Sequence, residues 1–181
     1  MADLERINRE LKYSGAILDV YSDTILFSNG NKEKWDYVAH RKGAAAVIPV
    51  LPDGRILLVR QYRNALNRET IEIPAGAKDF IGEESIVCAR RELEEETGYI
   101  SNDMEYLYTV ATTVAFCNEV IDVFVARNLV ETKKHPDENE FINVEAYNIS
   151  ELTELILKGK IQDSKTVGAI FAYKEKFLSK L

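Results

Sequence analysis

The chain has 181 residues and a mass of 20.6 kDa, the size of one domain built around a single core. Hydrophobic residues make up 46% of it and charged residues 29%, which excludes disordered and collagen-like chains. The longest apolar run, residues 43–51, is too short to cross a bilayer, and the charged start holds no apolar stretch of a secretory signal, so we expect a cytoplasmic protein without a membrane partner.

The negative charge of the chain is concentrated in two short segments. Thirty acidic and 23 basic residues give a net charge of −7, and residues 82–96 and 137–145 each have a net charge of −4. Such a surface repels nucleic acid unless a cation intervenes, so we expect no nucleic acid partner. The two cysteines, Cys88 and Cys117, are too few for a disulfide framework and are expected to be reduced thiols in a core.

The first half of the chain is predicted to form strands separated by turns. Residues 17–27 and 35–40 are rich in β-branched and aromatic side chains and flank the turn sequence SNGN, which predicts an antiparallel pair. Residues 44–50 and 55–61 flank the turn sequence LPDG and predict a second hairpin. Further strands are expected at residues 70–73, 105–112 and 120–126.

The clearest helix is predicted at residues 84–97. This segment contains no Gly or Pro, and its apolar residues recur at helical spacing. Gly98 follows as a left-handed terminator.

Two more helices are predicted near the C-terminus. Ser150 is expected to cap the first, which runs to Lys158, and either Asp163 or Ser164 to open the second, which runs to about Leu178. The order of strands and helices predicts a mixed β-sheet sandwiched between helices, in the α/β or α+β class.

Three glutamates of the predicted helix lie on one face. Glu92, Glu95 and Glu96 stand at positions i, i+3 and i+4, so their carboxylates project from within one turn. Like charges at this spacing cost about 0.2–0.5 kcal/mol per pair on an exposed helix, which Arg91 can partly offset. The cluster is either a solvated helix face or a site for a hard cation, because Mg²⁺, with Mn²⁺ as the alternative, takes carboxylates together with water and substrate phosphates.

The sequence around these glutamates resembles the Nudix box, a loop–helix–loop motif of pyrophosphohydrolases. The string RELEEETGY, residues 91–99, matches the second half of the box at nearly every position, with Tyr99 at the final, usually aliphatic site. The first half departs from the motif, because six residues instead of five separate Gly76 from Glu83. The extra residue precedes the helix, so the register of the three glutamates is unaffected.

This resemblance implies the Nudix fold and Mg²⁺-dependent cleavage of a nucleoside diphosphate linked to another group. It implies that Glu92 and Glu96 are the principal metal ligands and that Ala75 offers its backbone oxygen to the metal. Glu95 is implied to share a second ion, and Arg91 to orient the glutamates through ion pairs. Glu95 and Arg91 are thus expected among the catalytic residues.

Other segments resemble the ADP-ribose pyrophosphatase branch of the family. The strings GAAAVIPV, VRQYR and IEIPAG, which begin at Gly43, Val59 and Ile71, carry this likeness. One departure concerns the substrate, because Val114 and Ala115 replace a Pro-Gly pair that the branch usually carries. The resemblance implies hydrolysis of ADP-ribose to AMP and ribose 5-phosphate, or of a related nucleoside diphosphate sugar. The alternatives are another nucleoside diphosphate derivative, such as a dinucleoside polyphosphate, NADH or another nucleotide sugar, and a non-catalytic sensor of ADP-ribose-like ligands.

A second acidic segment is a candidate for proton transfer. Residues 137–140 follow Pro136 and form either a solvated turn or a mobile loop whose carboxylate takes a proton from the attacking water. In relatives this loop carries the catalytic base, and the resemblance assigns that role to Glu138 or Glu140. We favour Glu138 as the base and Glu140 as a metal-supporting or alternative base.

Four more residues are candidates for binding the substrate. The planar guanidinium of Arg63 suits the terminal ribose or its phosphate, and Arg41 and Glu72 face the same cleft in relatives. Surface ion pairing is the alternative role for both arginines. Trp35 offers a stacking platform for the adenine ring, with core packing as the alternative.

Relatives of this branch also form homodimers whose N-terminal strands exchange and complete the partner's site. By this resemblance, residues 1–42 are an N-terminal β extension that serves dimerisation, and residues 43–181 are the hydrolase domain. We therefore expect a homodimer.

Overall fold

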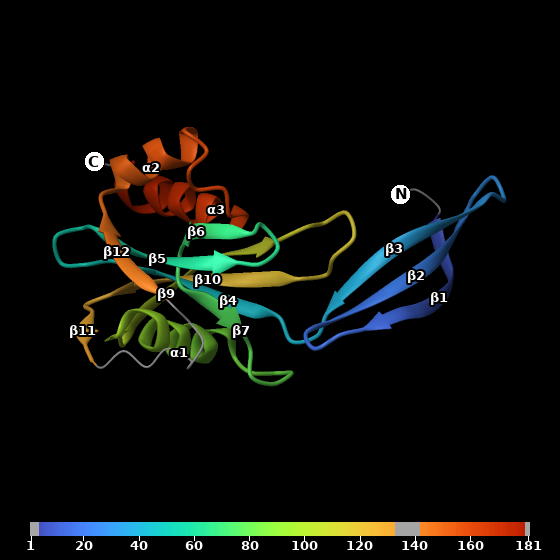
Figure 1. Cartoon of the computed structure of the whole chain (residues 1–181), viewed down its shortest axis with the longest axis horizontal. Coiled ribbons are helices and arrows are strands. Elements are labelled where there is room, and N and C mark those ends of the chain that lie inside the picture. The colour runs from blue at the N-terminus through green and yellow to red at the C-terminus, as the bar shows by residue number, and fades with distance from the viewer. Residues whose placement is uncertain (1–3, 133–141, 180–181) are drawn as a thin grey trace.

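The molecule consists of a layered body and a three-stranded sheet that projects from it (Figure 1). The computed structural model describes residues 4–132 and 142–179. In the body, helix α1 (Ser85–Thr97) covers one face of the strands, while α2 (Ile149–Leu157) and α3 (Ser164–Tyr173) cover the other (Figure 1). This sandwich of strands between helices confirms the predicted fold class.

The projecting sheet has the antiparallel order β1-β2-β3, with β1 (Leu4–Ser14), β2 (Leu18–Phe27) and β3 (Lys32–His40). The β2–β3 hairpin confirms the predicted pair, and the Phe27 N–H closes its turn by donating to the Asn31 carbonyl at 2.9 Å. The sequence pattern did not predict β1, because its many charged and polar residues bury almost no apolar surface. Instead, Arg9 of β1 donates to both carboxylate oxygens of Asp23 at 2.7 and 2.5 Å and lies over the ring of Tyr37.

A mixed sheet lies at the centre of the body in the order β7-β4-β10-β9, with β4 (Ala44–Pro49), β7 (Ala75–Ala77), β9 (Asp103–Ala111) and β10 (Val120–Arg127). Strand β10 runs parallel to β4, and the other neighbours are antiparallel. Every residue of β4 is buried, which explains its continuous apolar sequence, since a strand covered on both faces has no solvent side. Ala45 and Val47 pack toward α1, and Ala46 and Ile48 belong to the core on the opposite face.

A second, antiparallel sheet has the order β12-β5-β6, with β5 (Ile56–Arg63), β6 (Arg68–Glu72) and β12 (Asn143–Tyr147), and a short pair joins β8 (Tyr99–Ile100) to β11 (Val130–Glu131). The predicted hairpin of residues 44–50 and 55–61 is wrong in its pairing. The turn forms, but in the described part of the chain its two arms share a single bridge, between Val50 and Ile56, and then enter different sheets. Turn chemistry is local, whereas the partners of β4 come from distant segments that cover both of its edges.

The C-terminal helices begin at polar caps. Asn148 caps α2, so the predicted cap at Ser150 is wrong. The Glu151 side chain completes the cap by accepting a hydrogen bond of 2.8 Å from the Asn148 N–H. Asp163 caps α3 by accepting from the Thr166 N–H at 3.0 Å, which decides between the two predicted caps. Helix α3 continues into a π-helical turn, η1 (Lys174–Leu178), so the predicted end near Leu178 is confirmed.

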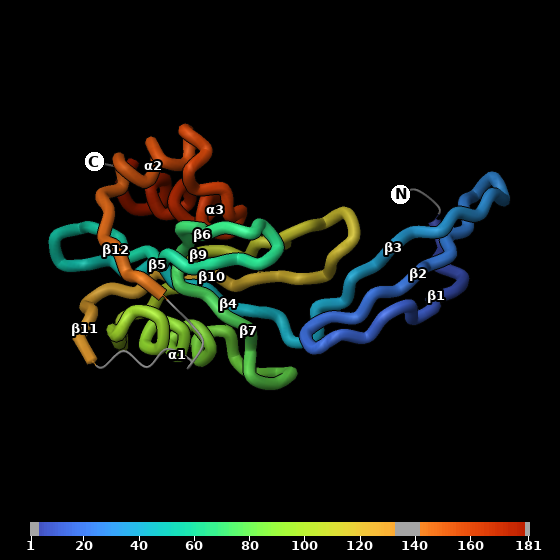
Figure 2. The backbone as a smooth tube through the Cα atoms, in the orientation of Figure 1, coloured from blue at the N-terminus to red at the C-terminus, as the bar shows by residue number. Residues whose placement is uncertain are grey.

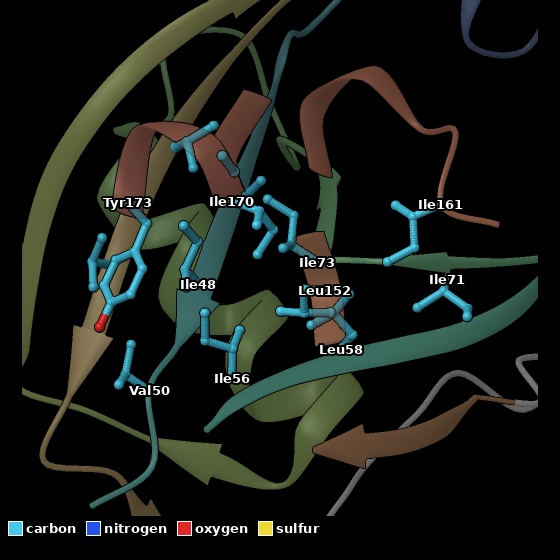
Figure 3. Close-up of a cluster of buried hydrophobic side chains, with 14 of the residues drawn as sticks. Ile48, Val50, Ile56, Leu58, Ile71, Ile73, Leu152, Ile161, Ile170 and Tyr173 are labelled. Carbon is cyan, nitrogen blue, oxygen red and sulfur yellow. The ribbon is translucent and has the colours of Figure 1, made fainter. Parts of the chain in front are cut away.

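The largest apolar core lies between the strands and the C-terminal helices (Figure 3). Its fully buried side chains come from both sheets, from α2 and α3 and from the segment between these helices, and include Ile48, Ile56, Leu58, Ile73, Leu152, Ile161 and Ile170. Because interiors of this kind are close-packed, the end of β6 and the segment that follows it are held on a rigid framework. No helix within residues 4–132 or 142–179 has the length and apolar character needed to pass through a membrane.

Candidate active site

Helix α1 is fixed against the central sheet by its apolar face. Ala89 and Leu93 are fully buried, and they pack with Ala45 and Val47 of β4. The helix ends at Gly98, which adopts φ 76° and confirms the predicted terminator. This packing fixes the rotation of the helix, so that its glutamate face meets β7.

Two of the three predicted ligand glutamates are buried against the segment that precedes the helix. Glu92 and Glu96 are 7% and 4% exposed, whereas Glu95 is half-buried. The Ala75 N–H donates a hydrogen bond of 3.0 Å to Glu96. Gly76 lets the Glu92 carboxylate approach the loop closely, because a Cβ at position 76 would come within 3.0 Å of the Glu92 carboxyl atoms and displace them. The structure thus brings Ala75, Glu92 and Glu96 together.

Arg91 lies in the middle of the acidic cluster. It donates a hydrogen bond of 2.6 Å to Glu92 and one of 3.0 Å to the Ala77 carbonyl. Three more carboxylates lie near its guanidinium, at 3.3 Å from Asp79, 3.4 Å from Glu95 and 3.6 Å from Glu83. An arginine with these contacts fixes the carboxylates relative to the loop, which fits the orienting role predicted for it.

The extra residue before the helix is accommodated in an exposed loop. Gly82 adopts the left-handed φ of 94°, and Phe80 and Ile81 are exposed. Glu83 is nevertheless 5% exposed and accepts a hydrogen bond of 2.7 Å from the Asp79 N–H. The insertion therefore changes the path of the loop and leaves Glu83 packed beneath it.

The donors gathered at this helix are of the type that a hard divalent cation takes. Carboxylate oxygens come from Glu92 and Glu96, and a backbone oxygen is available at Ala75. Across residues 4–132 and 142–179, no three His, Cys, Asp or Glu side chains converge as a metal site. An ion held here would complete its coordination with backbone, water and substrate oxygens, as Mg²⁺ commonly does.

A cavity of about 480 Å³ opens beside the segment that contacts Glu92 and Glu96. Its wall includes residues 75–77, the same segment that contacts Glu92 and Glu96. Among the described residues, no Phe, Tyr or Trp lines it. Its titratable side chains are those of His40, Arg63, Glu72, Glu119, Asp163 and Lys165. Such a lining suits a charged, hydroxyl-rich group better than a stacked base.

Arg63 and Glu72, which were predicted to bind the substrate, form an ion pair in the cavity wall. Arg63 donates from Nε and Nη2 to the two carboxylate oxygens at 2.8 and 2.7 Å. Lys165 donates to the same carboxylate at 2.5 Å, and Thr70 at 2.6 Å. Burial alone would raise the pKa of Glu72, but the hydrogen bond from Arg63 and the charge of Lys165 lower it to about 2. No sequence signal points to Lys165, since a lysine in the first turn of a helix is normally solvated.

The tip of the β9–β10 hairpin reaches the projecting sheet (Figure 2). The Val38 N–H donates to the Phe116 carbonyl at 2.7 Å, and the Asn118 N–H donates to the Val38 carbonyl at 3.2 Å. Beside this contact, His40 lies 3.5 Å from Glu119, and both side chains line the cavity. No sequence signal points to this pair, because only the fold brings these distant positions together.

Arg41 and Trp35 lie outside the cavity wall. Arg41 donates to Asp19 at 2.6 and 3.1 Å, and this hydrogen bonding lowers the pKa of Asp19 to about 2. Trp35 is 45% exposed on β3 and lines, with Phe116, a separate depression of about 570 Å³. Within one chain, the structure therefore does not bring these two predicted substrate-binding residues to the cavity.

Glu138 and Glu140, the predicted bases, lie outside the described residues. The described chain stops at Thr132, whose N–H donates to the Gly98 carbonyl at the end of α1, and resumes at Ile142. Their roles stay predictions.

Comparison with known proteins identifies the family. The NUDIX domain family model matches residues 40–168, which is most of the chain. The chain belongs to the Nudix family. Membership confirms the predicted class of enzyme, a Nudix pyrophosphohydrolase, and Nudix hydrolases generally use divalent metal ions.

Individual Nudix proteins are similar over nearly the whole chain. The ADP-ribose pyrophosphatase of Bacillus subtilis is 37% identical over 91% of this chain and 89% of that protein. The methanol dehydrogenase activator of Bacillus methanolicus is 38% identical, with the same coverage. A crystal structure of an ADP compounds hydrolase, 22% identical, aligns over 95% of this chain and 92% of that one with a TM-score of 0.86. This structural similarity confirms the Nudix fold.

Proposed function

We propose that this Nudix enzyme hydrolyses the diphosphate bond of ADP-ribose, or of a closely related nucleoside diphosphate sugar, with Mg²⁺ as cofactor. The products from ADP-ribose are AMP and ribose 5-phosphate. The observation that carries the proposal is a shared wall: residues 75–77 contact Glu92 and Glu96 and also line the cavity that contains Arg63. An oxygen-ligated cation and a guanidinium can thereby act on one diphosphate. The 37% identity to an ADP-ribose pyrophosphatase favours this substrate.

In this proposal the helix and its loop hold the metal. Glu92, Glu96 and the backbone oxygen of Ala75 are the principal ligands, and Glu95 shares a second ion. When bound, a divalent cation supplies neutralisation of the diphosphate charge and lowers the pKa of a coordinated water. Arg91 keeps Glu92 in position through its hydrogen bond of 2.6 Å.

The cavity and the second acidic segment supply the remaining groups. Arg63, held by Glu72, binds the terminal ribose or its phosphate. Glu138 takes the proton of the attacking water, and Glu140 supports the metal or acts as the alternative base. Proton transfer and charge neutralisation then come from different elements.

We also propose that the enzyme is a homodimer assembled through residues 1–42. Strand β1 exposes Leu4, Ile7, Leu11 and Tyr13 on a sheet that projects from the body, and burial of such apolar side chains would favour an interface. By the resemblance, an exchange of these strands would complete the partner's site. Light scattering of the full chain should give twice the monomer mass of 20.6 kDa, and a monomer would contradict the proposal.

The product spectrum tests the reaction and the substrate together. The full chain is incubated with ADP-ribose and Mg²⁺, and AMP and ribose 5-phosphate are resolved and quantified, with a chelator-treated sample as the control. A dinucleoside polyphosphate, NADH and another nucleotide sugar are compared at equal concentration. We expect the highest kcat/KM for ADP-ribose. If ADP-ribose is not turned over, or is turned over no faster than the other compounds, the proposed substrate is refuted. Binding of ADP-ribose in calorimetry without hydrolysis would support the sensor alternative instead.

A further inference from the structure

Lys165 is a buried cation that takes no part in the proposed reaction steps. It lies in the first turn of α3, its side chain is 9% exposed, and it lines the cavity. Its ammonium group lies 2.5 Å from Glu72 and 3.0 Å from Asp163. Burying an ammonium group is costly unless it is paired, and these two carboxylates supply the pairing.

Glu72 is the centre of the contacts that Lys165 makes. One oxygen of Glu72 accepts from Arg63 Nη2 and Lys165, and the other accepts from Arg63 Nε and Thr70. The Nε–Nη2 edge of the guanidinium is therefore used for Glu72. In the described part of the chain, no hydrogen bond or ion pair involves Nη1 of Arg63, so this end of the planar group is available to a ligand.

The charges of this group balance only when Lys165 is included. Arg63 and Lys165 carry two positive charges, and Glu72 and Asp163 carry two negative ones. Without Lys165 the set would have a net charge of −1, and an entering phosphate would meet a negative wall. Arg63 and Lys165 both donate to the Glu72 carboxylate, so two cations fix the position of one anion.

Helix α3 is capped by Asp163, whose carboxylate also accepts a hydrogen bond of 3.0 Å from Lys165. Asp163 accepts from the Thr166 N–H at 3.0 Å, and Thr166 Oγ1 accepts from the Ile73 N–H at 2.9 Å. These bonds join the start of α3 to the end of β6 without the lysine. The contact of Lys165 with Asp163 supports this cap, whereas its contact with Glu72 orders a side chain of the cavity wall.

We propose that Lys165 is a positioning residue: it holds Glu72 as a fixed anion, so that Arg63 is aimed at the sugar phosphate arm of the substrate. This inference rests on the proposed function, because it assigns the cavity to the ribose 5-phosphate half of ADP-ribose. The nucleoside half binds elsewhere and does not depend on the lysine. Loss of Lys165 should thus weaken binding of one half of the substrate only.

The experiment compares the two products as ligands. Calorimetry on the full chain with Mg²⁺ measures the Kd of ribose 5-phosphate and of AMP for wild type, Lys165→Met, Lys165→Gln and Lys165→Arg. Lys176→Met is the matched control, since Lys176 also forms an ion pair, with Glu105, but does not line the cavity.

Lys165→Met should weaken binding of ribose 5-phosphate by about tenfold or more, the effect of losing one charge-assisted contact, and change the Kd of AMP by less than about twofold. The KM for ADP-ribose should rise more than kcat falls. Lys165→Arg, which keeps the charge, should recover most of the binding, and Lys176→Met should behave as wild type. Lys165→Gln replaces Lys165→Met if the latter does not fold.

Three results would overturn the inference. They are equal weakening of both products, unchanged binding of ribose 5-phosphate, and a wild-type protein that does not bind ribose 5-phosphate. Failure of the proposed function is a different observation, because it is the absence of ADP-ribose turnover in the wild type, whereas calorimetry of the products requires no turnover.

Discussion

A methyl group at position 76 should separate catalysis from folding. In Gly76→Ala, the added Cβ would lie within 3.0 Å of the Glu92 carboxyl atoms, closer than real Cβ atoms come to their neighbours. No charge and no proposed ligand is removed. The substitution changes only the place that the Glu92 carboxylate can occupy, and it therefore tests whether the close approach of helix and loop builds the site.

The structure sets the size of the effect. Ordinary contact begins at 3.4 Å, so the carboxylate must retreat by about 1 Å, and a misplacement of about 1 Å at a catalytic centre costs about 100-fold in rate. The fold should tolerate the change, because the displaced atoms are the end of a flexible side chain and Gly76 is not among the residues with positive φ. We expect the free energy of unfolding to change by less than about 1 kcal/mol, since Gly→Ala at such positions is often slightly stabilising.

The assay measures kcat with saturating ADP-ribose and Mg²⁺, and urea unfolding of the same preparations. We expect kcat to fall by about 100-fold while the free energy of unfolding stays nearly unchanged. The effect acts through Glu92, so Gly76→Ala should add little to the loss in Glu92→Gln. Full activity of Gly76→Ala, or the same relative loss in the Glu92→Gln background, would refute the reasoning.

Three further predictions concern the carboxylates. Glu96→Gln should lower kcat by orders of magnitude without unfolding the protein, whereas Glu94→Gln on the same helix should stay near wild type; a fully active Glu96→Gln enzyme would exclude the metal role. Raised Mg²⁺ should restore activity to Glu140→Gln but not to Glu138→Gln, and normal rates in both would exclude this segment from proton transfer. The folded-state pKa of Glu72 is lowered from 4.5 to about 2, so its stabilisation, on the order of 3 kcal/mol, is present above about pH 4.5 and is lost as the pH falls through about 2. The free energy of unfolding, measured in urea, should therefore fall more steeply with decreasing pH in wild type than in Glu72→Gln. The same pH dependence in both proteins would contradict this prediction.

The features that sequence alone could predict are those with local causes. The helix over residues 85–97, its glycine terminator and the common face of its glutamates follow from spacing within a few residues. The β2–β3 hairpin follows from its turn and its β-branched flanks. For the same reason, a motif of consecutive residues was enough to indicate the family.

Features that depend on distant segments could not be predicted. Strand β1 forms through its ladder to β2 and the Arg9–Asp23 pair, although its own pattern buries little. The cavity takes Arg63 from β5, Glu72 from β6 and Lys165 from α3, which only the fold brings together. Periodicity reports which face of an element is buried, but it does not say which other element covers that face.

The charge distribution has a consequence for how a diphosphate can enter this site. One guanidinium, that of Arg91, serves four carboxylates, so these five groups together have a net charge of −3. A diphosphate with a charge of −2 about 6 Å away would be repelled by about 4 kcal/mol even with the dielectric constant of bulk water. Arg63 cannot reverse this alone, because Glu72 already neutralises it. In the proposed reaction, the cation must therefore bind before the substrate or together with it, and the acidic helix then selects substrates that arrive with a divalent metal.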